Sequence, residues 1–104
     1  MKHPKTVYIA GPITGVERYW EAFEEMEDEL TANGYVVLTP TRIPYNLDNE
    51  KAIKICLAMI EQADFVVFLP GWENSKGASL EMHYCIYTDK PTITDPDLLW
   101  EVDE

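Results

Sequence analysis

Three residues that could act together on a phosphorylated ligand, Ser75, Gly77 and Glu81, lie close together in the chain. A helix that starts at Ser75 would offer free backbone amides and a hydroxyl, and Gly77 would allow close approach. These groups would form a cradle for a phosphate. Serine is also among the commonest helix caps, so an ordinary cap is the alternative interpretation of Ser75.

Glu81 is the candidate for covalent chemistry. By helical angle it lies on the flank of an apolar face made of Ala78, Met82, Cys85 and Ile86. A carboxylate there is able to attack the anomeric carbon of a sugar or to hold a ribose hydroxyl, and the alternative is a solvated helical glutamate. Tyr8, near the end of a short apolar run, would favour the first interpretation if its phenol approached Glu81. Tyr8 alone is more often a core aromatic with a satisfied hydroxyl.

Short apolar runs and amphipathic segments alternate along the chain and would position these residues. The runs predict buried strands at 6–10, 35–38, 65–69 and 91–94. Helical spacing predicts helices at 17–33, from Asp48 or Asn49 to just before Asp64, and at about 75–88. In the first helix, the stripe expected to pack on the sheet consists of Tyr19, Trp20, Phe23, Met26 and Leu30.

This alternation predicts an α/β fold with a short parallel sheet of about four strands and helices on both faces. Ligands of such sheets bind beyond the carboxyl ends of the strands. Polar and glycine-rich segments follow three of the predicted strands, at 11–15, 39–45 and 71–77. The sequence therefore predicts a small-ligand site at that edge.

Composition narrows the range of partners. The formal net charge of −11, with no basic stripe to offset it, argues against a nucleic-acid polymer, although one local pocket suffices for a free nucleotide. The 104 residues, 46% of them apolar, fit a single domain over 1–104. No segment resembles a signal peptide or a membrane span, so a cytoplasmic location without membrane attachment is expected.

Cysteine and histidine usage gives no support for a metal site. Cys56 and Cys85 lack C-x-x-C spacing and are interpreted as buried small hydrophobes. His3 in the N-terminal tail and His83 on an outward helix face are expected to be exposed to solvent. We therefore expect no metal ion and no cofactor.

Three motifs, in this order, resemble the nucleoside 2-deoxyribosyltransferase-like superfamily. They are VYIAGPITG at 7–15, Ala63-Asp64 before a hydrophobic strand, and LPGWENSKGASLE at 69–81. The sequence is most similar to the small DUF4406 branch, which is frequent in phages and prophages, over residues 6 to about 95. The resemblance implies a three-layer flavodoxin-like or Rossmann-like fold and chemistry at the glycosidic bond of deoxynucleosides.

The resemblance also implies roles for individual residues. Glu81 matches the nucleophilic glutamate that forms a glycosyl-enzyme intermediate, and Tyr8 matches the tyrosine that orients it. Ser75 matches a serine that binds the phosphate in relatives that hydrolyse deoxynucleoside 5′-monophosphates, and Gly77 matches the adjoining glycine. The loop that surrounds the sugar phosphate corresponds to Gly11, Ile13, Thr14 and Gly15. Apart from the resemblance, we expect Arg18, Arg42 or Lys76 to add positive charge near the anion.

Two departures from the family pattern bear on catalysis. Active relatives usually carry an aspartate on the second helix that helps to protonate the leaving base, and Cys56 occupies that position here. A thiol is a poor general acid in this role. Relatives also often borrow a C-terminal residue from a neighbouring subunit, for which Asp95, Asp97 or Glu101 are candidates. A homo-oligomer, most simply a dimer, is therefore expected.

Three classes of function stay open at this point. The first is an enzyme, a 2′-deoxynucleoside 5′-monophosphate N-glycosidase or deoxyribosyltransferase with a glutamate nucleophile. The second is a nucleotide-binding module that senses or sequesters its ligand without turnover. The third is an interaction protein that binds a basic partner through the acidic face of the first helix, which is otherwise a solvated surface. That face consists of Glu17, Glu21, Glu24, Glu25, Asp28 and Glu29.

Overall fold

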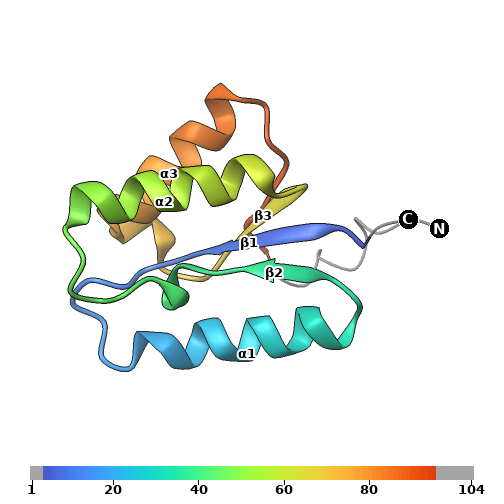
Figure 1. Cartoon of the computed structure of the whole chain (residues 1–104), viewed down its shortest axis with the longest axis horizontal. Coiled ribbons are helices and arrows are strands. Elements are labelled where there is room, and N and C mark those ends of the chain that lie inside the picture. The colour runs from blue at the N-terminus through green and yellow to red at the C-terminus, as the bar shows by residue number, and fades with distance from the viewer. Residues whose placement is uncertain (1–3, 96–104) are drawn as a thin grey trace.

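Four short parallel strands form the centre of the protein. A computed structural model describes residues 4–95. Across the sheet the strands follow the order β2-β1-β3-β4, so that β1 lies between β2 and β3 (Figure 1). The four predicted strands are confirmed, and no strand end differs from the predicted one by more than one residue. Their bounds are β1 (Thr6–Ala10), β2 (Val36–Leu38), β3 (Phe65–Phe68) and β4 (Thr92–Ile93).

Three helices cover the two faces of this sheet. They are α1 (Tyr19–Ala32), α2 (Asn49–Gln62) and α3 (Lys76–Tyr87). Figure 1 shows α1 on one face and α2 with α3 on the other, which confirms the expected three-layer α/β arrangement. Two short 3-10 turns, η1 (Pro40–Arg42) and η2 (Trp72–Asn74), fall in segments that the sequence predicts as irregular.

Local side-chain chemistry sets the ends of the helices. The carboxylate of Asp48 accepts a hydrogen bond from the backbone N–H of Glu50 at 2.8 Å, so Asp48 rather than Asn49 caps α2. After α1, Asn33 is the C-cap, and the next residue, Gly34, adopts a left-handed conformation with φ of +91°. Ser75 caps α3.

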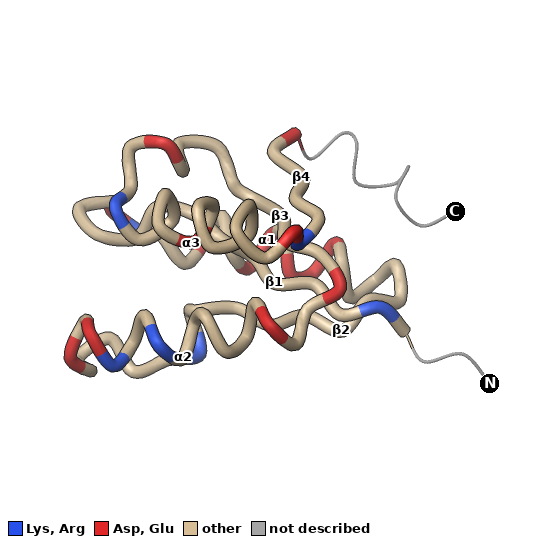
Figure 2. The backbone as a smooth tube through the Cα atoms, turned by 90° about the horizontal axis from the view of Figure 1, so that it is seen from above, with Lys and Arg blue, Asp and Glu red and all other residues tan. Residues whose placement is uncertain are grey.

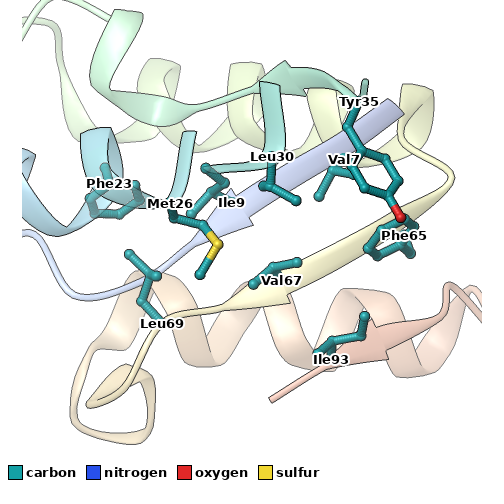
Figure 3. Close-up of a cluster of buried hydrophobic side chains, with 10 residues drawn as sticks. All are labelled: Val7, Ile9, Phe23, Met26, Leu30, Tyr35, Phe65, Val67, Leu69 and Ile93. Carbon is teal, nitrogen blue, oxygen red and sulfur yellow. The ribbon is translucent and has the colours of Figure 1, made fainter. Parts of the chain in front are cut away.

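The alternation of side chains along the strands creates two cores. On the α1 face, Phe23, Met26 and Leu30 pack against strand residues of the opposite layer, as Figure 3 shows. The other core lies under α2 and α3 and is built around Tyr8, Ala10, Cys56, Ile60, Val66, Phe68 and Cys85. Because neighbouring residues of a strand point to opposite faces, Tyr8 belongs to this second core, whereas Val7 and Ile9 belong to the first.

One expectation about α1 is wrong. Trp20 was expected within the buried stripe, but its side chain is 45% exposed. Trp20 lies about 100° around the helix from Tyr19, which places it beyond the edge of the apolar face. Its ring contacts the ring of Tyr19 edge to face, with centroids 5.5 Å apart, instead of entering the core.

Most charged residues are exposed to solvent, and Figure 2 marks their positions along the backbone. The predicted acidic face of α1 is indeed exposed to solvent, and so is His83 on α3. Within residues 4–95, no helix combines the length and the apolar character needed to cross a membrane.

Candidate active site

A buried hydrogen bond joins β1 to α3. The phenol of Tyr8 donates to a carboxylate oxygen of Glu81, Oε2, over 2.6 Å, although the two residues are 73 positions apart in the sequence. Tyr8 is 0% exposed and Glu81 4% exposed. Glu81 is therefore not the solvated helical glutamate of the alternative interpretation. The structure brings together the two residues for which the sequence predicts catalytic roles.

The surrounding elements fix both side chains. Tyr8 lies on β1, one of the two inner strands, in register with Leu38 of β2 and Val66 of β3, so its backbone is held on both sides. Glu81 lies in the second turn of α3, on the same buried face as Ala78 and Cys85. Since this face packs on the sheet, the Glu81 carboxylate is directed toward the core.

Burial dominates the electrostatics of the pair. It raises the pKa of Glu81 to about 7 from the ordinary 4.5, while the hydrogen bond from Tyr8 and the contact with Cys56 act in the opposite direction. Burial, followed by the neighbouring charge of Glu81, also raises the pKa of Tyr8, so this phenol stays neutral and donates. At neutral pH the carboxyl group of Glu81 is thus balanced between its two protonation states.

Two thiols accompany the pair. Cys56, on the buried face of α2, is close enough to interact with both Tyr8 and Glu81, and Cys85 lies one turn beyond Glu81 on α3. Burial raises the pKa of each thiol to about 11. Both cysteines are buried, as predicted, and Cys56 lies in the same core as Tyr8.

At the start of α3, Ser75 caps the helix and Gly77 has no close neighbour on the side where a Cβ would point. The Ser75 hydroxyl accepts a hydrogen bond from the backbone N–H of Ala78 at 3.2 Å, which confirms the helix-cap interpretation. A Cβ added at Gly77 would meet no atom within 4 Å, so packing does not require glycine there. Whether these residues also hold a phosphate stays a prediction.

The loop after β1 is fixed against the segment after β3. A Cβ added at Gly11 would come within 3.0 Å of Leu69, so packing alone accounts for glycine at this position. Gly15 has a positive φ of +78°, a conformation that favours glycine. Ile13 is half-buried and packs on the core under α1, whereas Thr14 is exposed. Their expected role around a sugar phosphate stays a prediction.

Two of the three basic residues expected near an anion form ion pairs with glutamates instead. Arg18 forms a 3.4 Å ion pair with Glu21, and Arg42 forms one with Glu27. Both glutamates belong to α1, on the sheet face opposite Glu81. Lys76 is exposed at the first residue of α3. Of the three basic candidates, Lys76 is therefore the one on the same helix as Glu81.

Two surface grooves lie along α1 instead of over the buried pair. The first, of about 780 Å³, runs past Trp20 and Arg42, and the second, of about 610 Å³, is bordered by Pro12, Phe23 and Leu69. Neither Tyr8 nor Glu81 lines either groove. The C-terminal candidates Asp97 and Glu101, like His3, lie outside the described residues.

The comparisons with known proteins agree with the fold. The model of a family described as "Domain of unknown function (DUF4406)" matches residues 5–94. A 2-deoxyribosyltransferase from Bacillus psychrosaccharolyticus is similar in structure with a TM-score of 0.67 and 19% identity, over 84% of this chain and 69% of that one. A 2-deoxyribosyltransferase from Leishmania mexicana gives a TM-score of 0.69 and 21% identity, over 86% and 62%. No curated protein matches the sequence.

Proposed function

The chain belongs to the DUF4406 family, and from this premise we propose that it is a cytoplasmic N-glycosidase of 2′-deoxynucleoside 5′-monophosphates. Its fold is that of 2-deoxyribosyltransferases. At this level of identity the similarity concerns the fold alone, so the activity has to be argued from the residues of this chain. Transfer of the sugar to a second base is the same chemistry with another acceptor.

The observation that carries the proposal is the buried Tyr8–Glu81 hydrogen bond. A carboxylate on a solvated helix face needs no partner, whereas Glu81 is almost completely buried and accepts a 2.6 Å bond from a phenol. Burial of a carboxylate costs stability, and such costs are concentrated at functional sites. In the proposed reaction Glu81 is the nucleophile and Tyr8 is the group that orients it.

In the proposed reaction the Glu81 carboxylate attacks C1′ of the deoxynucleotide. A bond forms between C1′ and a carboxylate oxygen, the C1′–N bond breaks, and its electron pair leaves with the base, which takes a proton from solvent. Water then attacks C1′ and loses a proton, and the ester bond to Glu81 breaks. The products are free base, 2-deoxyribose 5-phosphate and the regenerated carboxylate. Tyr8 orients Glu81 through its hydrogen bond.

The phosphate would be held at the start of α3. Ser75 and Gly77 lie in the first turn of this helix, where backbone N–H groups have no partner within the helix. Such groups and the helix dipole favour an anion. This local field supports phosphate binding despite the net charge of −11.

A second candidate, a nucleotide-binding module without turnover, is favoured by Cys56. Its thiol stands beside Glu81, and burial raises its pKa to about 11. A group with that pKa gives up its proton poorly to a leaving base near neutral pH. In this alternative the chain binds the nucleotide in the same place but leaves the glycosidic bond intact.

The test is to incubate the protein with each of the four 2′-deoxynucleoside 5′-monophosphates and to measure free base by chromatography. We expect base from the wild type and none from Glu81→Ala. Glu24→Ala, at an exposed position of α1, is the matched control and should release base at the wild-type rate. Equal release by Glu81→Ala and wild type would exclude the proposed mechanism. A thermal shift with nucleotide, but no base release, would favour the binding module.

A further inference from the structure

The outward side of α3 carries exposed apolar side chains. Leu80, His83 and Tyr87 follow one another at spacings of three and four residues, so they line one side of the helix, opposite the buried face that holds Glu81. We call these three residues the α3 stripe. Leu80 is 47% exposed and Tyr87 88%, and Ile86 on the flank of the stripe is 65% exposed. A helix that is apolar on both sides is normally buried on both sides, so the α3 stripe is typical of an interaction surface.

The distribution of charge indicates which partner fits this surface. The chain has a formal net charge of −11, and a second copy carries the same charge, so much of the surface repels another copy. The exposed face of α1 is acidic and suits a basic partner instead. In α3, the only carboxylate from Lys76 to Tyr87 is that of Glu81, which is buried. Two copies of the chain can therefore meet through α3 without bringing carboxylates together.

The two ends of α3 carry opposite charges. Lys76 is its first residue, Asp89 follows its last turn, and both are exposed. The 12 residues of the helix separate these ends by about 18 Å, so the two charges are not partners within one chain. In an antiparallel pair of α3 helices about a two-fold axis, Lys76 lies at the same end as Asp89 of the partner subunit. Leu80 then lies opposite the partner subunit's Tyr87, and Tyr87 opposite the partner subunit's Leu80.

We propose that the α3 stripe is a self-association surface, through which two copies of the chain form a symmetric dimer with antiparallel α3 helices. The apolar side chains form the centre of this interface, and the Lys76–Asp89 pairs set its orientation at both ends. Antiparallel packing also brings helix dipoles of opposite direction together, which is favourable. The proposal goes beyond the proposed function, because it assigns an interface that exists without nucleotide.

The test is sedimentation velocity of the full chain without nucleotide, over about a hundredfold range of protein concentration. We expect a dimer for the wild type. Leu80→Glu places a carboxylate in the middle of the interface and should raise the dissociation constant at least about tenfold. Trp20→Glu is the matched control, because Trp20 is 45% exposed, lies on α1 and gives the same change in charge. This control should associate like the wild type.

A charge exchange tests the antiparallel orientation with substitutions at exposed positions only. Lys76→Asp and Asp89→Lys should each raise the dissociation constant about threefold or more, because each creates two pairs of like charges per dimer. The double variant carries both substitutions and restores the opposite charges at each end. We therefore expect it to associate more tightly than either single variant.

A monomeric wild type, or equal weakening by Trp20→Glu and Leu80→Glu, would overturn the proposal. A double variant that associates no more tightly than the single variants would overturn it too, because the ends of the two helices would then not meet. If Leu80→Glu does not fold, the charge exchange still decides. Failure to release base would count against the proposed function without affecting these measurements.

Discussion

Replacement of Glu81 by glutamine removes a group that titrates near neutral pH. Burial raises its pKa from 4.5 to about 7, so the folded protein holds this proton more tightly than the unfolded chain does. The resulting stabilisation is complete at pH values below 4.5, the pKa of Glu81 in the unfolded chain. It is lost as the pH rises from there through about 7, the pKa in the folded protein. At about 1.4 kcal/mol per pKa unit, the loss is about 3 kcal/mol. This is a large share of the roughly 5–15 kcal/mol that keeps a small domain folded.

Urea unfolding followed by tryptophan fluorescence, at pH 5 and at pH 8, measures this effect. Titration of the other carboxyl groups is common to both proteins and cancels in their difference. Relative to wild type, Glu81→Gln should gain about 2–3 kcal/mol of unfolding free energy between pH 5 and pH 8. Glu24→Gln, at an exposed position, should stay within about 0.5 kcal/mol of wild type at both pH values. A Glu81→Gln difference that is independent of pH would refute this electrostatic reasoning.

Four further variants and one mass measurement extend these expectations. Tyr8→Phe removes a donor and should move the titration midpoint of Glu81 from about 7 to about 8, so base release at pH 7 should fall about fivefold and recover at pH 9. Equal loss at both pH values would point to a different role for the phenol. Gly11→Ala should cost about 1–3 kcal/mol in urea unfolding, because the added Cβ would meet a leucine side chain at 3.0 Å. Gly77→Ala, which meets no atom within 4 Å, should not destabilise the protein. Cys56→Asp places a second carboxyl group beside Glu81 and should raise base release about tenfold or more by supplying a general acid. An unchanged rate would show that proton supply does not limit the reaction. Light scattering of the full chain should give the mass of a dimer, and a strict monomer would contradict that expectation.

Most of the fold could be predicted because its signals are local. The apolar runs that form β1 and β3 are short and end at turn residues, and both strands are buried as expected. Asp48 and Ser75 are typical caps, and both cap the helices that follow them. Trp20 was predicted wrongly because the spacing of apolar residues along a helix does not define how wide the contact with the sheet is.

The site could be predicted only in part, because it depends on distant contacts. The Tyr8–Glu81 bond joins residues 73 positions apart, and its formation requires the register of β1 and the rotation of α3 together. The ion-pair partners of the basic residues were harder still to predict. Arg18 pairs with Glu21, three residues further along the chain, whereas Arg42 pairs with Glu27, which is 15 positions away, and no local signal in the sequence indicated this second pair.

Detection of a covalent intermediate tests the central role of Glu81 most directly. The protein is mixed with a 2′-deoxynucleoside 5′-monophosphate from which it releases base, quenched with acid within the first turnover, and digested for peptide mass spectrometry. We predict an added deoxyribose phosphate on the peptide that contains Glu81, together with free base, and neither product from Glu81→Gln. Base release by the wild type with the adduct on another residue, or undiminished release by Glu81→Gln, would contradict the proposed role of this carboxylate.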